Sequence, residues 1–406
     1  MNRSKLTRIG ARGIRLLFLS ALLIIFHPGT SAQTPQGRGA PGRVGPDGPV
    51  VVSPTVLPDR RVIFRFYAPG AQQVRAAFEG AERTSGVPSG GMNLTKGPDS
   101  VWQATLGPLD PGAYRYNFAV DGAIVTDPRN IESERMQVMT RSILYVPGAA
   151  FMDTEDVPHG AVSLVTYFSK VLNKFRRLHI YTPPGYEASQ QRYPVLYLLH
   201  GANESDDSWS TVGRAGFILD NLIADGRSVP MIVVMPNGHV DQTPPSLGGG
   251  VPGGPPPIRR ELVDFPNEFA ADIMPYIESH YRTIPDRAHR AIAGLSMGGS
   301  QTLNIAFASL EKFSAIGVFS SGILGGKAAD WEKGHLAALD DPKLKKELKT
   351  IWFSTGSADF LLANSNATVE MLNKHGFSAT FRESEGAHTW ANWRNYLHEF
   401  APGLFR

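Results

Sequence analysis

A serine lies at the centre of a short glycine-flanked motif, Gly294-Leu295-Ser296-Met297-Gly298. An apolar run precedes the motif and a segment with helical spacing follows it, which is the strand–turn–helix context of a nucleophile elbow. The turn is so tight that side chains at Gly294 and Gly298 would collide with each other, and it lifts the Ser296 hydroxyl clear of the sheet. The start of the following helix also favours a developing negative charge. The pattern predicts that Ser296 is a nucleophile.

A serine at neutral pH needs a base that takes its proton. His388 lies on a loop after the last predicted strand, where the base of a hydrolase belongs. Ten other histidines compete with it: His27 lies in the N-terminal segment, His398 in a predicted terminal helix and His200 in a glycine turn after another strand. We therefore predict His388 as the base.

An acid that orients the base is expected between nucleophile and base in the chain. Asp359 follows a predicted strand and a glycine turn and is the predicted acid, with Glu383 and Glu385 as alternatives. Three further aspartates lie in a charged stretch that indicates exposed surface, namely Asp330, Asp340 and Asp341.

A second glycine turn ends the buried strand pattern that leads to His200-Gly201-Ala202-Asn203. Loops of this kind supply one backbone N–H to an oxyanion hole, and the residue after the nucleophile supplies the other. The predicted donors are the amides of Ala202 and Met297. His200 is then interpreted as a structural residue of the loop and not as a second base.

Two tryptophans close to these motifs are candidate substrate-binding residues, Trp209 and Trp390. Core packing is the alternative for both, as it is for Trp393. Residues 238–259 contain six Gly and six Pro without apolar periodicity. They are interpreted as a mobile flap over the site, with an ordinary surface loop as the alternative.

The segment 155–406 alternates between short apolar runs and longer stretches with helical spacing. Predicted strands lie at 176–181, 194–199, 231–235, 290–293, 315–319, 350–354 and 378–382, and predicted helices at 217–225, 265–281, 300–310 and 367–375. Such alternation indicates a mostly parallel sheet covered by helices. We therefore predict an α/β class protein with an α/β-hydrolase fold at 155–406.

Short alternating strands separated by Gly, Pro and Asp run through residues 50–147. This spacing is typical of a small all-β immunoglobulin-like sandwich. Trp102 lies in one of the alternating strands, and core packing is favoured for it over contact with a ligand.

The N-terminal segment 1–32 combines basic residues with an 11-residue apolar run and small residues at 30 and 32. The run is too short to span a bilayer, so a cleaved signal peptide is predicted, with an uncleaved anchor as the alternative. Residues 33–49 are Gly/Pro-rich and are predicted to form a linker. Export without any cysteine suits a secreted or periplasmic bacterial protein that does not contact the membrane after cleavage.

The formal net charge of +3 comes largely from the N-terminal segment, which holds five basic residues and no acidic one. The remainder carries 35 basic and 37 acidic residues, so a nucleic-acid partner is not expected. The absence of cysteine excludes a thiol nucleophile and any Cys-based metal site. No H-E-x-x-H spacing occurs, and neither a metal nor a cofactor is predicted.

Three motifs together resemble the putative esterase family that contains carbohydrate esterase family 1. They are Tyr181-Thr182-Pro183-Pro184-Gly185-Tyr186, the run from Tyr193 to Gly201 (YPVLYLLHG) and Gly294-Leu295-Ser296-Met297-Gly298-Gly299. The sandwich, with Pro111-Gly112-Ala113-Tyr114 and Val120-Asp121-Gly122, resembles the early-set domain of carbohydrate-binding module family 48. The resemblance implies hydrolysis of feruloyl or acetyl esters on plant xylan, and relatives of the family include siderophore triester hydrolases.

The combined expectation is a secreted serine carboxylic-ester hydrolase that releases feruloyl or acetyl groups from xylan-type polysaccharides or oligosaccharides. Its partner is an ester-bearing carbohydrate or a small-molecule ester, and the N-terminal domain is a candidate for polysaccharide contact. One alternative is a siderophore triester hydrolase of the enterochelin type. Another is a carbohydrate-binding protein whose esterase half is inactive.

Overall fold

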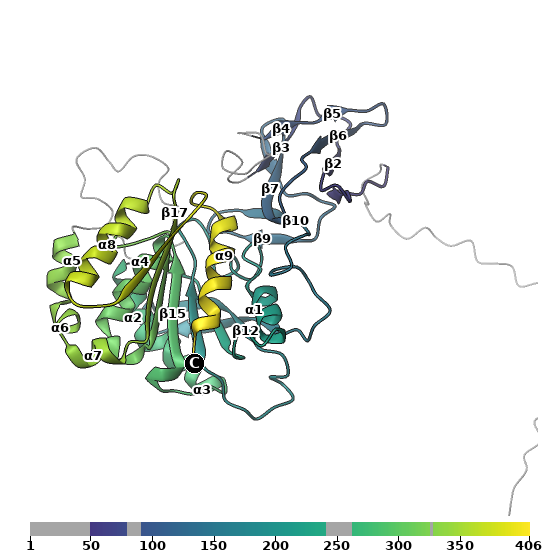
Figure 1. Cartoon of the computed structure of the whole chain (residues 1–406). Helices are drawn as coiled ribbons and strands as arrows, with labels where there is room; N and C mark the ends of the chain where they lie inside the picture. Colours follow the sequence, from purple (N-terminus) through teal and green to yellow (C-terminus); the bar gives the residue numbers. More distant parts are fainter. Residues whose placement is uncertain (1–48, 79–90, 241–261, 325–327) are drawn as a thin grey trace, which may run out of the picture. The chain divides into compact units, whose positions relative to one another are not determined.

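The computed structural model describes residues 49–78, 91–240, 262–324 and 328–406 (Figure 1). The predicted signal peptide at 1–32, nearly all of the linker at 33–49 and most of the predicted flap at 238–259 lie outside the described residues. Residues Pro49–Arg406 form one compact unit, which holds both the β-sandwich and the α/β part.

The N-terminal part of this unit contains two antiparallel sheets with strand orders β1-β2-β6-β5 and β4-β3-β7-β10-β9, and β8 pairs with β7. Buried residues that alternate along the longer strands, among them Phe64 and Phe118, fill the space between the sheets. The strands are β1 (Thr55–Val56), β2 (Val62–Tyr67), β3 (Val74–Phe78), β4 (Met92–Asn93), β5 (Thr95–Lys96), β6 (Val101–Leu106), β7 (Gly112–Val120), β8 (Ala123–Val125), β9 (Ser133–Arg135) and β10 (Thr140–Val146).

The C-terminal part is built on an eight-stranded sheet with the order β11-β12-β14-β13-β15-β16-β17-β18. β11 and β12 are antiparallel to their neighbours, and the pairs from β14 onward are parallel. The strands are β11 (Ala161–Ser169), β12 (Lys174–Thr182), β13 (Val195–Leu199), β14 (Ile232–Pro236), β15 (Arg290–Leu295), β16 (Ala315–Phe319), β17 (Thr350–Gly356) and β18 (Ala379–Ser384).

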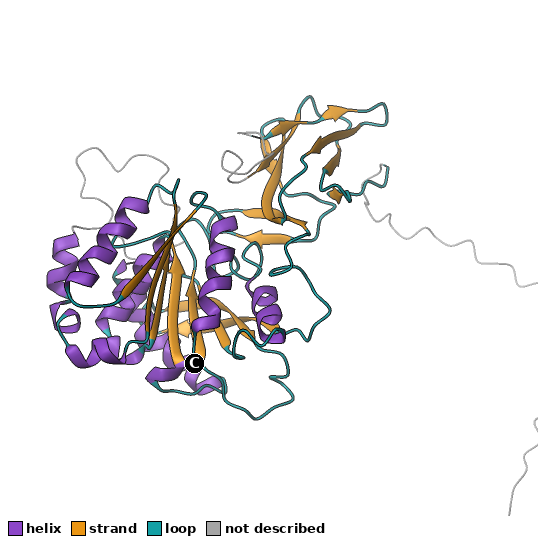
Figure 2. Ribbon diagram, viewed as in Figure 1, coloured by secondary structure: helices purple, strands orange, loops and turns teal. Residues whose placement is uncertain are grey.

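Helices cover both faces of this sheet, which gives the three layers seen in Figure 2. One hydrophobic cluster joins α1 and α9 to the sheet, and a second joins α2, α3, α4 and α8 to the other face. The α-helices are α1 (Ala215–Ala224), α2 (Asp264–Glu268), α3 (Met274–His280), α4 (Met297–Ala308), α5 (Ala328–Gly334), α6 (Leu336–Leu339), α7 (Pro342–Glu347), α8 (Leu362–Lys374) and α9 (Trp390–Phe400). The predicted α/β-hydrolase fold behind a β-sandwich is therefore confirmed.

In the C-terminal part, two groups of elements have no counterpart in the sequence-based prediction. The strand β11 is exposed along its first four residues, so it lacks the buried alternation that marks a strand. The helices α5, α6 and α7 are short and mostly exposed, and they occupy the charged stretch that was interpreted only as surface. Short exposed elements bury too few apolar residues to leave a periodic signal.

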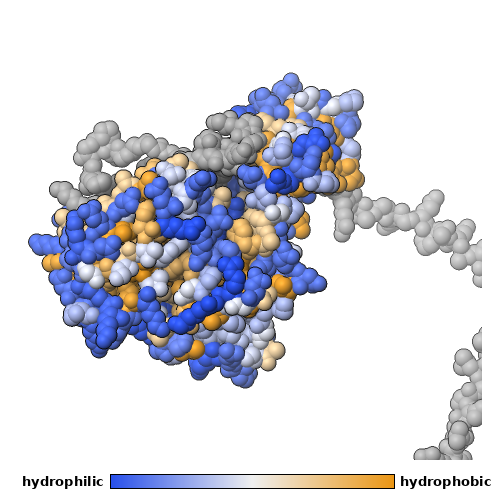
Figure 3. All heavy atoms as spheres, viewed as in Figure 1, coloured by the Kyte–Doolittle hydropathy of each residue, from blue (hydrophilic) through white to orange (hydrophobic). Residues whose placement is uncertain are grey.

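No helix among the described residues combines the length and the apolar character that a bilayer crossing requires. The face shown in Figure 3 mixes hydrophilic and hydrophobic residues.

Candidate active site

Ser296 lies in a sharp turn between the end of β15 and the start of α4. Its backbone angles are φ 52° and ψ −118°, a conformation that costs energy for a residue with a side chain and that marks functional turns. A Cβ atom at Gly294 would stand 2.4 Å from the carbonyl of Gly298, and one at Gly298 would stand 2.4 Å from the carbonyl oxygen of His200. Both positions therefore need glycine.

His388 lies between Ser296 and Asp359 and makes hydrogen bonds with both. Its Nε2 is 3.0 Å from the Ser296 hydroxyl oxygen, and its Nδ1 is 2.9 and 3.0 Å from the two carboxylate oxygens of Asp359. The residues follow β15, β17 and β18, whose carboxyl ends meet at one edge of the parallel sheet. The Asp359 side chain is fully buried and that of His388 is 12% exposed, which leaves the imidazole accessible to a substrate.

The carboxylate of Asp359 remains charged although it is buried. Burial acts to raise its pKa, but the hydrogen bond from His388, with the amide of Leu361 and the hydroxyl of Ser320, lowers the pKa below the ordinary value. An ionised Asp359 accepts the Nδ1–H of His388 and leaves the Nε2 lone pair directed at the serine. The alternative acids Glu383 and Glu385 are both exposed, and the carboxylate that contacts His388 is that of Asp359.

The loop after β13 lies directly against the Ser296 turn, since a Cβ atom at Gly201 would stand 3.4 Å from that of Ser296. The amide of Ala202 lies in this loop and makes no backbone hydrogen bond within the described residues. The amide of Met297, at the first position of α4, likewise has no helical acceptor. Both predicted oxyanion donors are therefore available to a ligand.

His200 is a structural part of this loop. Its Nδ1–H donates to the carbonyl of Gly201 at 2.8 Å, and its Nε2 accepts the amide of Gly238 at 2.8 Å. Burial, followed by the neighbouring His239, lowers the pKa of His200 to about 3. The imidazole is therefore neutral and engaged at both nitrogens, which agrees with the structural interpretation of this residue.

A buried ionic network connects the β-sandwich to the same loop. Glu204 Oε2 accepts the amide of Gly201 at 2.9 Å, while Glu204 Oε1 accepts Trp390 Nε1 at 2.8 Å and Arg115 Nη1 at 3.3 Å. Arg115 on β7 also donates its Nε to Glu134 on β9 at 2.8 Å. The side chains of Arg115, Glu134 and Glu204 are 1%, 0% and 6% exposed. Arg115 of the β-sandwich thus holds Glu204, and Glu204 in turn positions Gly201, the residue before Ala202.

The substrate-binding role predicted for Trp209 and Trp390 is wrong in this structure. Trp209 is 1% exposed and donates its Nε1 to the carbonyl of Leu199, so it presents no surface to a ligand. Trp390 is 8% exposed, and its ring packs edge-on against Trp209 at 5.0 Å and against Trp393 at 5.2 Å. The packing alternative holds because Trp209, before α1, and Trp390, at the start of α9, belong to one buried cluster.

Phe360 is an aromatic residue beside the site that the sequence-based reasoning missed. Its side chain is 67% exposed, and its ring centroid lies 4.5 Å from that of His388. Phe360 directly follows Asp359 in the chain. A bulky apolar residue next to the predicted acid was therefore the sequence feature that could have identified it. A large exposed ring next to a catalytic imidazole is suited to contact an acyl group.

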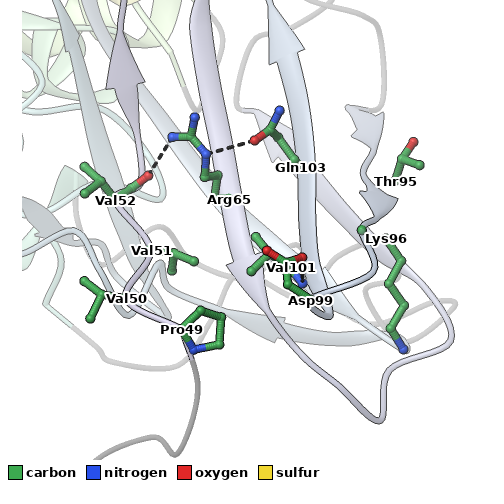
Figure 4. Close-up of a pocket in the computed structure, with 11 residues that line it drawn as sticks. Pro49, Val50, Val51, Val52, Arg65, Thr95, Lys96, Asp99, Val101 and Gln103 are labelled. Atoms are coloured by element: carbon green, nitrogen blue, oxygen red, sulfur yellow. Dashed lines mark hydrogen bonds between the residues drawn. The ribbon is translucent and has the colours of Figure 1, made fainter.

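A hollow of about 620 Å³ lies on the β-sandwich and is shown in Figure 4. Arg65 spans one side of it and hydrogen-bonds Gln103 and the carbonyl of Val52. No aromatic side chain is among the described residues that line it. Trp102 is 7% exposed and donates its Nε1 to the carbonyl of Ala68, so it packs in the core. Polysaccharide contact through this part of the chain stays a prediction.

The model of the family described as "Putative esterase" matches residues 169–404, more than half of the chain. An endo-1,4-beta-xylanase/feruloyl esterase of Xylanibacter ruminicola is 33% identical over 353 residues, which are 84% of this chain and 44% of that protein. The chain thus spans less than half the length of this relative.

Among solved structures, a ferulic acid esterase of carbohydrate esterase family 1 from the anaerobic fungus Anaeromyces mucronatus is 26% identical, with a TM-score of 0.52 over 64% of this chain and 96% of that one. The enterobactin esterase of Shigella flexneri has a TM-score of 0.56 over 84% of this chain and 92% of that one. Its 17% identity shows a shared fold only. On the family match and the feruloyl esterase relative, the chain belongs to this esterase family.

Proposed function

We propose that the chain releases feruloyl or acetyl groups from xylan-type polysaccharides or their oligosaccharides, with Ser296, His388 and Asp359 as its catalytic triad. The observation that carries the triad is the continuous hydrogen-bonded chain from Asp359 through His388 to the Ser296 hydroxyl. The similarity to the xylanase/feruloyl esterase of Xylanibacter ruminicola supports the choice of substrate.

The reaction begins with attack of Ser296 on the ester carbonyl. His388 Nε2 accepts the hydroxyl proton, and the imidazolium that forms is stabilised by the ionised Asp359. The amides of Ala202 and Met297 donate hydrogen bonds to the carbonyl oxygen as it becomes negative. The tetrahedral intermediate then collapses, and His388 returns the proton to the departing sugar alcohol. The acyl group remains on Ser296.

Water completes the cycle by the same route. His388 takes a proton from water, the resulting hydroxide attacks the acyl-enzyme, and Ser296 leaves with the proton. Every proton transfer in both halves uses one nitrogen atom of His388, so no further acid or base is required.

Export belongs to the same proposal. The basic, apolar and small-residue pattern of residues 1–32 supports a signal peptide. A polysaccharide too large to enter a cell would then meet the enzyme in the periplasm or outside.

A siderophore triester hydrolase is the second candidate, because the enterobactin esterase shares its fold with 84% of this chain, a share that includes sandwich residues. A carbohydrate-binding protein with an inactive esterase half is less well supported, because the three triad side chains lie within hydrogen-bonding distance of one another.

The test combines active-site labelling with a panel of substrates. A fluorophosphonate should label the parent protein and the Ser279→Ala variant, which removes an exposed serine on α3, but should not label Ser296→Ala. The parent and Ser279→Ala should release ferulate from methyl ferulate or acetate from acetylated xylan. Full activity in Ser296→Ala would contradict the assigned nucleophile. Hydrolysis of a ferric catecholate ester, with xylan esters untouched, would favour the second candidate.

A further inference from the structure

A second hollow, of about 500 Å³, lies beside β12 at the carboxyl edge of the large sheet. β12 runs antiparallel to β14, and the start of β12 extends past the carboxyl end of β14. The opposite wall comes from β9 and the residues that follow it. Four basic side chains line the hollow, and none of the described lining residues is acidic. They are Arg135, Lys174, Arg176 and Arg177.

Two of these cations are compensated by carboxylates. Arg176 is paired with the buried Glu268 at 3.0 Å, and Arg177 is paired with the buried Asp206 at 2.8 Å. These pairs hold the two guanidinium groups in place. Because each carboxylate offsets the charge of its partner, Arg176 and Arg177 shape the hollow more than they add to its positive potential.

The other two cations are not compensated in this way. Lys174 donates its ammonium to the carbonyl of Val240, and the guanidinium of exposed Arg135 has no carboxylate partner among the described residues. The carboxylate of Asp207 accepts the backbone amide of Arg135 and is not among the lining residues. The hollow therefore carries positive charge that a bound anion would neutralise.

An exposed aromatic ring also lines the hollow. Phe175 is 74% exposed and touches Phe168 edge-on at 5.2 Å, and Val138 on the facing wall is 50% exposed. A ligand that fits must offer an apolar face to this ring and an anionic group to the cations. A sugar ring that carries a carboxylate has both, because its C–H face covers the aromatic ring while the carboxylate stays at the edge.

The hollow is also close to the nucleophile. Asn237 and His239, which line it, follow β14, and the amide of the intervening Gly238 is bonded to His200 of the oxyanion loop. β14 lies two positions from β15 in the sheet and β12 lies three, which places the hollow about 10 to 15 Å from Ser296 at ~4.8 Å per strand. A few linked sugar units span that distance.

We propose that this hollow binds a carboxylate-bearing sugar unit of the same chain that carries the scissile ester. The inference rests on the proposed function, since it names a feature of the polysaccharide that the enzyme would recognise. It assigns Arg135, Lys174 and Phe175 to substrate selection and leaves the chemistry to the triad.

Binding is tested on the Ser296→Ala protein, so that esters are not consumed. Calorimetric titration would compare a xylo-oligosaccharide that bears one glucuronic acid with the neutral oligosaccharide of equal length. The acidic ligand should bind about tenfold more tightly at low salt, and the advantage should shrink as salt screens the charges. Adding Arg135→Gln or Lys174→Gln should weaken binding of the acidic ligand about two- to fivefold each. Lys343→Gln, which removes an exposed cation on α7, should not.

Kinetic measurements distinguish a failure of the proposed subsite from a failure of the proposed esterase function. With Ser296 intact, Arg135→Gln should hydrolyse methyl ferulate at the parent rate but show a raised KM on feruloylated acidic oligosaccharides. If the parent protein leaves methyl ferulate and acetylated xylan intact, the proposed function fails. If it hydrolyses them but binds acidic and neutral oligosaccharides equally, or if Lys343→Gln weakens binding as much as Arg135→Gln, the subsite is overturned.

Discussion

Glu383 and Glu385 could replace Asp359 by residue type, but among these three acids Asp359 is the one whose carboxylate contacts His388. The Asp359→Asn variant keeps the shape of the side chain but cannot stabilise the imidazolium and favours the wrong imidazole tautomer. We expect kcat on methyl ferulate to fall by about 10⁴ with little change in KM. Steady-state kinetics measure both.

The matched control is Glu385→Gln, which neutralises an exposed carboxylate on the loop before His388. It should retain most of the parent activity. An equal loss in both variants would mean that the orienting acid is misassigned.

Phe360 is the exposed aromatic side chain that contacts His388. In the Phe360→Ala variant, KM for methyl ferulate should rise about 2- to 10-fold, because an aromatic acyl group loses a ring contact. Hydrolysis of methyl acetate should change little, since acetate has no ring to contact. The melting temperature should hardly move, because an exposed side chain contributes little to stability.

Leu336→Ala on α6 removes another exposed apolar side chain, away from His388, and serves as the control. If both variants raise KM equally, or if Phe360→Ala affects both esters alike, the contact with the acyl group is disproved.

Three helices of the C-terminal part meet at His375, the residue that directly follows α8. Its Nε2 is 2.9 Å from Glu332 on α5, and its Nδ1 is 2.9 Å from Asp340, which follows α6. The hydrogen bonds to Glu332 and then to Asp340 raise the pKa of His375. The folded protein therefore holds the second imidazole proton of His375 more tightly than the unfolded chain does. The contacts of protonated His375 with the two carboxylates stabilise the fold below pH ~6.5, and this stabilisation is lost as pH rises through the folded pKa.

The His375→Gln variant should therefore lower the melting temperature at pH 5.5 and have a much smaller effect at pH 9. The carboxylates are partly exposed, so the loss at pH 5.5 should be about 1 kcal/mol or less. Thermal melts across this range measure it, with His280→Gln as a control, because His280 contacts a backbone carbonyl and a serine hydroxyl. If His375→Gln lowered the melting temperature equally at every pH, the ionic origin of the stabilisation by His375 would be contradicted.

Across Pro49–Arg406, the link that couples the sandwich to the active site runs through Arg115, Glu204 and the amide of Gly201. The Arg115→Met variant leaves Glu134 and Glu204 buried without their cation, which should cost about 3 kcal/mol of stability. Turnover should also fall, because the loop that carries the amide of Ala202 loses its support. Calorimetry measures the loss of stability, and kcat at 25 °C measures the loss of turnover.

Arg61→Met, which breaks the exposed pair with Asp59 on the same sandwich, is the control and should change neither quantity measurably. A lower melting temperature with an unchanged kcat in Arg115→Met would mean that the network holds the fold together but does not position the oxyanion loop.

The amino-acid sequence alone determined the parts of this protein that depend on neighbours in the chain. The Ser296 motif is a local strand–turn–helix, and the apolar periods around it predict the sheet and its main helices, because buried elements carry a repeating pattern. The chain order of Ser296, Asp359 and His388 narrowed the choice of acid and base without any contact being known.

Only the tertiary structure decided which side chains meet and which are covered. His388 reaches Ser296 across 92 residues, and Arg115 reaches Glu204 across 89. Trp209 is buried and Phe360 exposed for the same reason, since the packing of α1 and α9 on the sheet covers one ring and leaves the other at the edge. Burial and long-range contact depend on how whole elements pack, and residue type at one position does not encode that.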